Sequence, residues 1–352
     1  MTSPAYSRPA VFALIAVLLA FGLGEAGLRI SGFSYQAGPV YMQFGYPNQQ
    51  TLSRIFQRDP ILFWNLIPNS TYLPDHIHIN SKGFRGPEFR IEKPRGTIRI
   101  IALGDSCTFL GERSYPERLE EKLRKAFPGR SLEVINMAVP GYSSFQGLRL
   151  LERQAIMLRP DLVTVFFGWN DHWPSRGTKD RNQKAPGLRV AALQKVLGHL
   201  CIYQVIHWLV HEIQPHEKQE NRVPIPDYKE NLRQIVRLAR GRKAEVILIT
   251  APTAAQKGAG LAPYLLAEGI IQDADSALAM HQEYNEAVRE LANETKAALV
   301  DAASIFQDNP DPGFFWKDNM HLSEAGLEWL SGLIAHQIQV EELINTDFAV
   351  EE

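Results

Sequence analysis

The stretch IRIIALGDS, residues 98–106, decides the fold prediction. A short apolar run, rich in β-branched residues, ends at Gly104 and is followed by Asp105 and Ser106. Apolar runs of this length that end at a glycine are typical of strands buried on both faces of a sheet. In α/β proteins, ligands bind beyond the carboxyl ends of such strands. The polar residues after Gly104 are therefore candidates for a functional site.

Apolar runs alternate with helical patterns from this stretch to the C-terminus. We predict strands at residues 98–103, 132–136, 162–167, 245–250 and 298–300, and helices at residues 115–127, 144–158, 228–240, 279–295 and 323–339. Such alternation indicates βα units and a mostly parallel sheet that is covered by helices on both faces. The predicted fold class is α/β, with three α/β/α layers.

Two segments interrupt this alternation. We interpret residues 174–226 and 253–276 as insertions in a main domain that spans residues 97–340. Residues 31–96 are rich in Pro, Gly, Asn and Tyr, which predicts a connector that packs on the main domain, with a turn at residues 80–83. Residues 341–352 form a C-terminal tail.

An uncharged apolar run, residues 9–24, lies between Arg8 and the pair Glu25 and Arg29. A bilayer core needs about 20 apolar residues, so the run spans it only if Glu25 and Arg29 lie at the far interface. Three interpretations compete: a signal anchor, a signal peptide cleaved at Gly24-Glu25-Ala26, and a buried core helix. We predict that residues 1–30 are a signal anchor with one transmembrane helix. The main domain then lies on the periplasmic or extracytoplasmic side, and cleavage would release a secreted protein.

Composition and charge do not indicate nucleic acid as a partner. The chain has 352 residues, 45% hydrophobic and 22% charged, with a net charge of -2 and no long basic run. This balance is typical of a globular protein and does not favour nucleic acid as a partner. The two cysteines, Cys107 and Cys201, are too few for a disulfide framework. The sequence does not encode the oligomeric state.

Four polar motifs lie after predicted strands or before the last helix: GDSC at 104–107, VPGY at 139–142, GWND at 168–171 and DNMH at 318–321. Each motif alone is most simply a turn or a helix cap. Together they offer a serine hydroxyl at a sheet edge, an unhindered glycine N–H and an asparagine amide. They also offer a histidine that can take the serine proton and an aspartate three residues before it that can hold the imidazole.

In this order the four motifs resemble the GDSL or SGNH hydrolases, a superfamily of esterases and acyltransferases. The residues that carry the resemblance are Ser106, Gly141, Asn170 and His321, with Asp318 beside His321. Residues 79–88 resemble a segment found ahead of the catalytic block in membrane-anchored bacterial members. The resemblance implies a flavodoxin-like three-layer domain that uses no metal and no organic cofactor.

The resemblance also implies a role for each matching residue. Ser106, Asp318 and His321 would be the catalytic residues, and Ser106 would attack an ester carbonyl to form an acyl-enzyme that water then releases. The oxyanion hole would consist of the Ser106 N–H, the Gly141 N–H and the Asn170 side chain. Cys107 departs from many relatives, and we predict that it packs inward rather than acting as the nucleophile.

Three functions remain open at this point. The first is a hydrolase that cleaves a carboxylic ester, the second an O-acyltransferase that moves an acetyl group to an envelope polysaccharide or glycan, and the third a non-catalytic envelope binding or assembly protein. The intact Ser106, Asp318 and His321 favour the two enzymes. The expected partners are a small-molecule or glycan ester and, through the N-terminal helix, a membrane.

Other residues offer rival interpretations. Asp75 and His78 form a second Asp-x-x-His. This pair is a rival for the catalytic Asp and His, because some related O-acetyltransferases place theirs ahead of the serine. His207 and His211 lie one helical turn apart, as zinc ligands can, but the sequence lacks the glutamate of His-Glu-x-x-His. The apolar stretch at residues 190–210 is interpreted first as a core helix. Its alternatives are an acyl-binding lid, a surface against the bilayer and a subunit contact.

Overall fold

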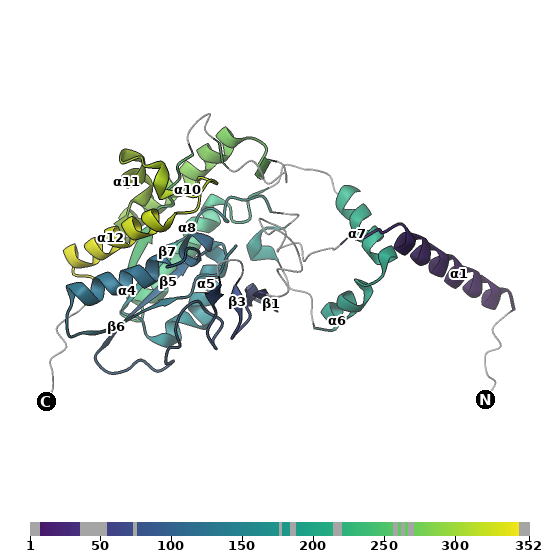
Figure 1. The fold of residues 1–352 in the computed structure, drawn as a ribbon, viewed down its shortest axis with the longest axis horizontal. Coiled ribbons are helices and arrows are strands. Elements are labelled where there is room, and N and C mark those ends of the chain that lie inside the picture. The colour runs from purple at the N-terminus through teal and green to yellow at the C-terminus, as the bar shows by residue number, and fades with distance from the viewer. Residues whose placement is uncertain are drawn as a thin grey trace. The chain divides into compact units, whose positions relative to one another are not determined.

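The computed structural model describes residues 8–35, 55–72, 76–175, 178–183, 188–213, 220–255, 260–261, 265–266 and 271–344. The chain divides into two compact units (Figure 1). The smaller unit combines residues 1–43 with residues 185–218, and the larger combines residues 44–184 with residues 219–352. The larger unit contains all four motifs, and the smaller contains the apolar N-terminal segment.

The larger unit is built on a five-stranded sheet with the order β6-β5-β7-β8-β9. Its strands are β5 (Thr97–Gly104), β6 (Ser131–Asn136), β7 (Leu162–Phe166), β8 (Glu245–Ile249) and β9 (Ala298–Val300). Every neighbouring pair is parallel. In chain order this is the 2-1-3-4-5 arrangement of doubly wound, flavodoxin-like sheets. The α/β prediction with a parallel central sheet is confirmed.

Helices cover the sheet in two groups. The first group is α4 (Tyr115–Ala126) and α12 (Glu324–Val340), which lie side by side (Figure 1). The second group is α5 (Ser144–Arg153), α8 (Ile225–Arg240) and α10 (Ala274–Thr295), in which α8 packs against both others. Right-handed crossovers place α4 on one face, because β5 to β6 runs opposite to the later steps across the sheet. The result is the predicted three-layer arrangement.

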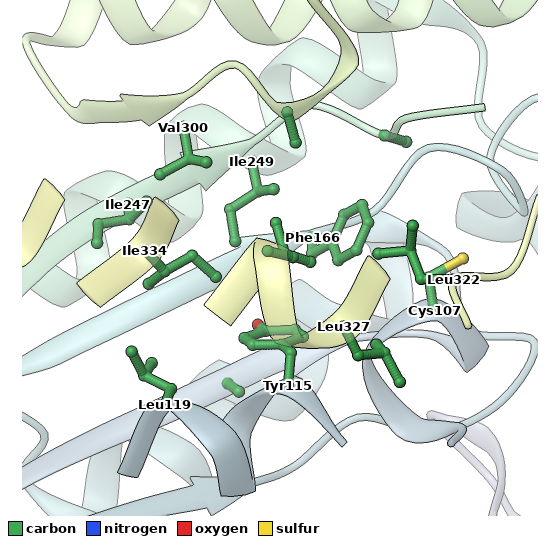
Figure 2. Packing of buried hydrophobic residues seen from close by; sticks show 14 of the residues in the cluster. Cys107, Tyr115, Leu119, Phe166, Ile247, Ile249, Val300, Leu322, Leu327 and Ile334 are labelled. Carbon is green, nitrogen blue, oxygen red and sulfur yellow. The ribbon is translucent and has the colours of Figure 1, made fainter. Parts of the chain in front are cut away.

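The core between α4, α12 and the sheet is formed by aliphatic and aromatic side chains. Figure 2 shows Tyr115 and Leu119 of α4 facing Leu327 and Ile334 of α12. The sheet contributes Phe166, Ile247, Ile249 and Val300 to the same cluster. Each fully buried side chain of this size contributes about 1.5–3 kcal/mol. This packing fixes β5 and therefore the position of the residues that follow it.

Several predicted boundaries differ from the structure. The predicted helix at residues 144–158 ends at Arg153 and continues as the 3₁₀ turn η2 (Ala155–Leu158). The helix predicted from residue 279 begins at Ala274, because the Asp273 side chain accepts from the Ser276 N–H and caps it. The interpreted insertion at 253–276 therefore ends inside a helix. The short helices α3 (Ser106–Phe109) and α11 (Ala302–Asp308) were not expected from the sequence.

The described part of the predicted connector forms two small antiparallel sheets. One pairs β1 (Phe56–Asp59) with β2 (Phe63–Leu66), and the other pairs β3 (Thr71–Tyr72) with β4 (Ile77–His78). The turn at residues 80–83 is present, and Gly83 has a φ of 81° there. Buried Arg85 follows it and donates to the carbonyl oxygens of Phe109 and Gly111 at 2.6 and 2.8 Å. Arg85 thereby fixes the chain just beyond α3.

The smaller unit contains α1 (Arg8–Ile30), α6 (Leu188–Leu197) and α7 (Cys201–Ile213). Residues 188–213 are thus two helices rather than one stretch. Large apolar side chains of these helices are at least half exposed, which contradicts the interpretation as a core helix: Val190, Leu193, Val196, Ile206 and Val210.

Helix α1 is long and apolar enough to cross a membrane, and none of its residues is buried. The interpretation of residues 9–24 as a core helix is therefore wrong. The Glu25 carboxylate accepts from the backbone N–H groups of Cys201 and Ile202, both at 3.0 Å, and so caps α7. Cys107 and Cys201 are both free thiols.

Candidate active site

Ser106 lies at the first position of α3, directly after β5. Asp105 caps this helix, and its Oδ1 accepts from the Cys107 N–H at 2.8 Å. Since α3 has only four residues, its dipole contributes little to the site. The Ser106 N–H makes no hydrogen bond within the described part of the chain. This free N–H, rather than a helix dipole, is what the turn offers to a developing negative charge.

Gly104 is required by close packing at this turn. A Cβ atom there would lie 2.0 Å from the Thr108 Oγ1 and 3.0 Å from the Phe166 carbonyl oxygen. Neither neighbour can move far, because Thr108 is buried and the carbonyl belongs to β7. The glycine of the Gly-Asp-Ser motif thus allows Thr108 to pack directly against the end of β5.

We expect Gly104→Ala to lower the free energy of unfolding by about 1–3 kcal/mol, because it overpacks a filled site. Chemical denaturation measures the change. Gly332→Ala is the matched control, since a Cβ atom there would meet nothing within 4 Å on α12. The control is expected to be neutral or slightly stabilising. Equal stability of the Gly104→Ala variant and the wild type would contradict the packing argument.

A hydrogen-bonded chain joins Ser106, His321 and Asp318. The His321 Nε2 lies 2.9 Å from the Ser106 Oγ, and the His321 Nδ1 lies 2.6 Å from the Asp318 Oδ2. Asp318 Oδ1 also accepts from the backbone N–H groups of Met320 and His321, each at 2.9 Å. The loop before α12 therefore holds both side chains, and the imidazole lies between carboxylate and hydroxyl.

The electrostatics of Asp318 suit this position. Burial raises the pKa of the carboxyl, but the hydrogen bond and electrostatic interaction with His321 and the backbone N–H groups of His321 and Met320 outweigh burial. The net effect lowers the pKa of Asp318 below its ordinary value, so the carboxylate remains ionised at neutral pH. An ionised partner at Nδ1 stabilises an imidazolium and keeps Nε2 directed at the serine.

Gly141 follows β6 and Asn170 follows β7, the two strands that flank β5 in the sheet. The β5–β6 ladder ends at Ala102 and Asn136, and beyond it the Val139 N–H donates to the Gly104 carbonyl at 3.2 Å, so the chain after β6 stays in contact with the end of β5. Gly141 has a φ of 82°, which favours glycine, and its N–H has no hydrogen-bond acceptor among the described residues. The Asn170 Nδ2 donates to the Asp105 Oδ2 at 2.8 Å and retains a second N–H.

Asp105 has a role that the sequence did not suggest. It is fully buried and links the turn at Ser106 to Asn170 through its two carboxyl oxygens. Burial raises its pKa, against the opposing effect of the Cys107 N–H and the Asn170 amide. Its place between the glycine and the serine of the motif was the only sequence signal for this role.

Cys107 is buried beside the core, and Figure 2 shows it near Leu322. Burial, followed by the charges of Asp105 and Asp318, raises the pKa of its thiol well above the ordinary value. A protonated, buried thiol is a poor nucleophile. The prediction that Cys107 packs inward is confirmed.

The rival residues are not assembled in the described part of the chain. His78 is exposed on β4 and shares no hydrogen bond with Ser106, and Asp75 lies outside the described residues. His207 lies on α7, whereas the side chain of His211 is outside the described set. Within that set, no three His, Cys, Asp or Glu side chains form a group that could hold a metal ion.

Asp171, next to Asn170, is a buried carboxyl with an unusual charge state. Its Oδ1 accepts from the Ser144 N–H and Oγ at 2.9 and 2.5 Å, whereas its Oδ2 has no partner among the described residues. Burial, only partly offset by the Ser144 hydrogen bonds, raises the pKa of Asp171 to about 8. Folded Asp171 thus keeps a proton that the unfolded chain releases near pH 4.

This proton makes stability fall as pH rises from about 4 to about 8, because the folded state binds more protons than the unfolded state. Asp171→Asn keeps the shape and removes the titration. We expect the variant to be more stable above pH 8, by up to about 5 kcal/mol, and its stability to depend less on pH. Denaturant unfolding at several pH values measures this. An unchanged pH dependence would show that Asp171 does not hold the proton.

A comparison of the sequence with models of protein families identifies the family of this chain. The model of the GDSL-like lipase/acylhydrolase family matches residues 102–329. The chain belongs to this family. It is therefore an ester-hydrolysing enzyme, and the match spans all four motifs. A search of curated proteins found no match.

Several solved structures of lipases and esterases are similar to this chain. One is a lipase/acylhydrolase from Enterococcus faecalis, with 20% identity and a TM-score of 0.47, covering 69% of this chain and 96% of that one. Another is an acetylxylan esterase from Geobacillus stearothermophilus, with 18% identity and a TM-score of 0.46, covering 68% and 94%. A GDSL-like lipase from Parabacteroides merdae has 16% identity and a TM-score of 0.45, covering 73% and 100%.

Proposed function

We propose that the enzyme hydrolyses a carboxylic ester through an acyl-enzyme on Ser106, with His321 as general base and Asp318 as its partner. The observation that carries the proposal is the continuous hydrogen-bonded chain from the Ser106 Oγ through His321 to Asp318. The family match supports the same chemistry, because its members are lipases and acylhydrolases.

The reaction proceeds in two halves. The Ser106 Oγ attacks the ester carbonyl while the His321 Nε2 takes its proton, and Asp318 stabilises the resulting imidazolium. The negative charge on the carbonyl oxygen is received by the N–H groups of Ser106 and Gly141 and by the Asn170 amide. His321 then protonates the leaving alcohol. A water molecule, deprotonated by His321, attacks the acyl-enzyme and releases the acid and free Ser106.

The acceptor of the acyl group decides between hydrolase and O-acyltransferase. The experiment gives the purified full chain a short-chain chromogenic ester, with and without an oligosaccharide acceptor. The proposal predicts full turnover without acceptor and free acid as the product. Turnover that rises with acceptor, together with an acylated oligosaccharide, would replace the hydrolase by the transferase. Absence of both turnover and serine labelling by a fluorophosphonate would support a binding protein instead.

We propose further that α1 remains attached as a signal anchor, with the larger unit on the extracytoplasmic side. Cleavage after Ala26 would remove Glu25, whose carboxylate caps α7. Retention of α1 preserves this cap and the ion pair of Glu25 with Arg29. Cell fractionation with protease treatment of intact cells tests the proposal. A full-length, membrane-bound and protease-accessible chain is expected, and a shortened soluble chain would contradict it.

A further inference from the structure

The peptide bond between Pro140 and Gly141 is held from outside the α/β core. Its N–H belongs to Gly141 and is one of the proposed oxyanion donors, and its carbonyl belongs to Pro140. The indole Nε1 of Trp64 donates to this carbonyl at 3.1 Å, in a buried contact. The N–H and C=O of a trans peptide point in opposite directions. A bond that holds the carbonyl of Pro140 therefore also fixes the direction of the Gly141 N–H.

The next peptide is held in the same way. The Gly141 carbonyl accepts from an Arg222 guanidinium nitrogen at 2.9 Å. Arg222 forms a buried ion pair with Asp180, also at 2.9 Å, and lies over the Trp64 ring at 5.9 Å. Asp180 in turn accepts from the Ser143 hydroxyl at 2.6 Å. Buried, charge-assisted hydrogen bonds of this kind fix geometry, because breaking one leaves a charge without a partner.

The hairpin that carries Trp64 is itself strained and tightly held. Phe63 has a φ of 68°, a left-handed conformation that is rare for a bulky residue. Asp59 stabilises the turn before it, because its Oδ1 accepts from the N–H groups of Ile61 and Leu62. The Phe63 ring stacks on Phe145 with a centroid distance of 6.0 Å. Strain that the surroundings maintain in this way is frequent at functional sites.

We propose that Trp64, together with Arg222, is a positioning residue that aims the Gly141 N–H at the oxyanion. The inference rests on the proposed function and gives two segments outside the α/β core a role in it. Trp64 comes from the predicted connector and Arg222 from the predicted insertion at residues 174–226. They hold two consecutive carbonyls of the Gly141 loop before substrate arrives, so the donor needs no reorganisation when charge develops.

The test compares Trp64→Phe with Trp329→Phe, using the short-chain chromogenic ester and the full chain. Trp64→Phe keeps an aromatic ring but removes the donor to Pro140. Trp329→Phe makes the same chemical change in the aromatic cluster of Phe306 and Phe314. We expect Trp64→Phe to lower kcat about 10- to 100-fold with KM within about twofold, because the lost interaction acts in the transition state. The affinity for a boronic acid that mimics the tetrahedral intermediate should fall in parallel.

A second variant tests the inference independently, in case the first does not fold. Arg222→Lys keeps the charge opposite Asp180 but loses the planar guanidinium that reaches both Asp180 and Gly141. It is expected to show the same loss in kcat at unchanged KM, and it decides the question if Trp64→Phe does not fold. A folded Trp64→Phe variant with the kcat of Trp329→Phe, or a loss confined to KM, would overturn the inference. An inactive wild type would instead overturn the proposed function and, with it, this inference.

Discussion

Ser106→Ala is expected to lower kcat/KM for ester hydrolysis by about 10⁴-fold or more. The substitution removes the atom that forms the acyl-enzyme and leaves the oxyanion donors in place, so only the slow reaction with water remains. The Ser106 side chain contributes a hydrogen bond to His321 but no core packing, and the fold should be retained. Steady-state kinetics with the chromogenic ester measure the loss, and circular dichroism checks the fold.

Cys107→Ala is the matched control, because Cys107 is the adjacent residue and its thiol is the side chain most easily mistaken for the nucleophile. Its thiol is buried and its pKa is raised by burial, so we expect activity within about threefold of the wild type. Activity that survives in Ser106→Ala and disappears in Cys107→Ala would assign the reaction to the thiol.

His321→Ala is expected to have an effect of similar size, about 10³- to 10⁴-fold in kcat, because the hydroxyl of Ser106 loses its proton acceptor. His78→Ala is the control, since His78 is exposed on β4 and belongs to the rival Asp-x-x-His pair. We expect the control to retain its kcat within about twofold. A large loss in His78→Ala with kcat retained in His321→Ala would assign the general base to His78 and contradict the role of the Asp318–His321 pair.

The sequence predicted the sheet and the placement of the motifs because both depend on strong local patterns. Strand-like apolar runs such as residues 98–103 are bounded by glycine or proline, and their carboxyl ends meet at one edge of a parallel sheet. The motifs at Ser106, Gly141 and Asn170 follow three such strands, so their proximity follows from topology alone. The hydrogen bonds from Asn170 to Asp105 and from Val139 to Gly104 agree with this proximity.

Features that depend on long-range packing could not be predicted. The contact of Trp64 with the Pro140 carbonyl joins residues 76 positions apart, and the hairpin that carries Trp64 has no clear period in its sequence. The exposure of Val190 and Leu193 was also hidden, since an apolar helix has the same sequence pattern whether it is buried in a core or exposed. The sequence indicated only that Gly104 is a turn residue. The structure shows why a side chain is not tolerated there, because a Cβ atom would collide with Thr108.

The central claim is that an acyl group is carried by Ser106, and trapping this intermediate tests it most directly. The full chain is mixed with the chromogenic ester, quenched in acid within milliseconds, digested and analysed by mass spectrometry. We expect an acyl adduct on the Ser106 hydroxyl, with none on Cys107, and a larger yield of the adduct in a variant that hydrolyses the acyl-enzyme more slowly. An adduct on any other residue, or turnover without an adduct at any quench time, would contradict it.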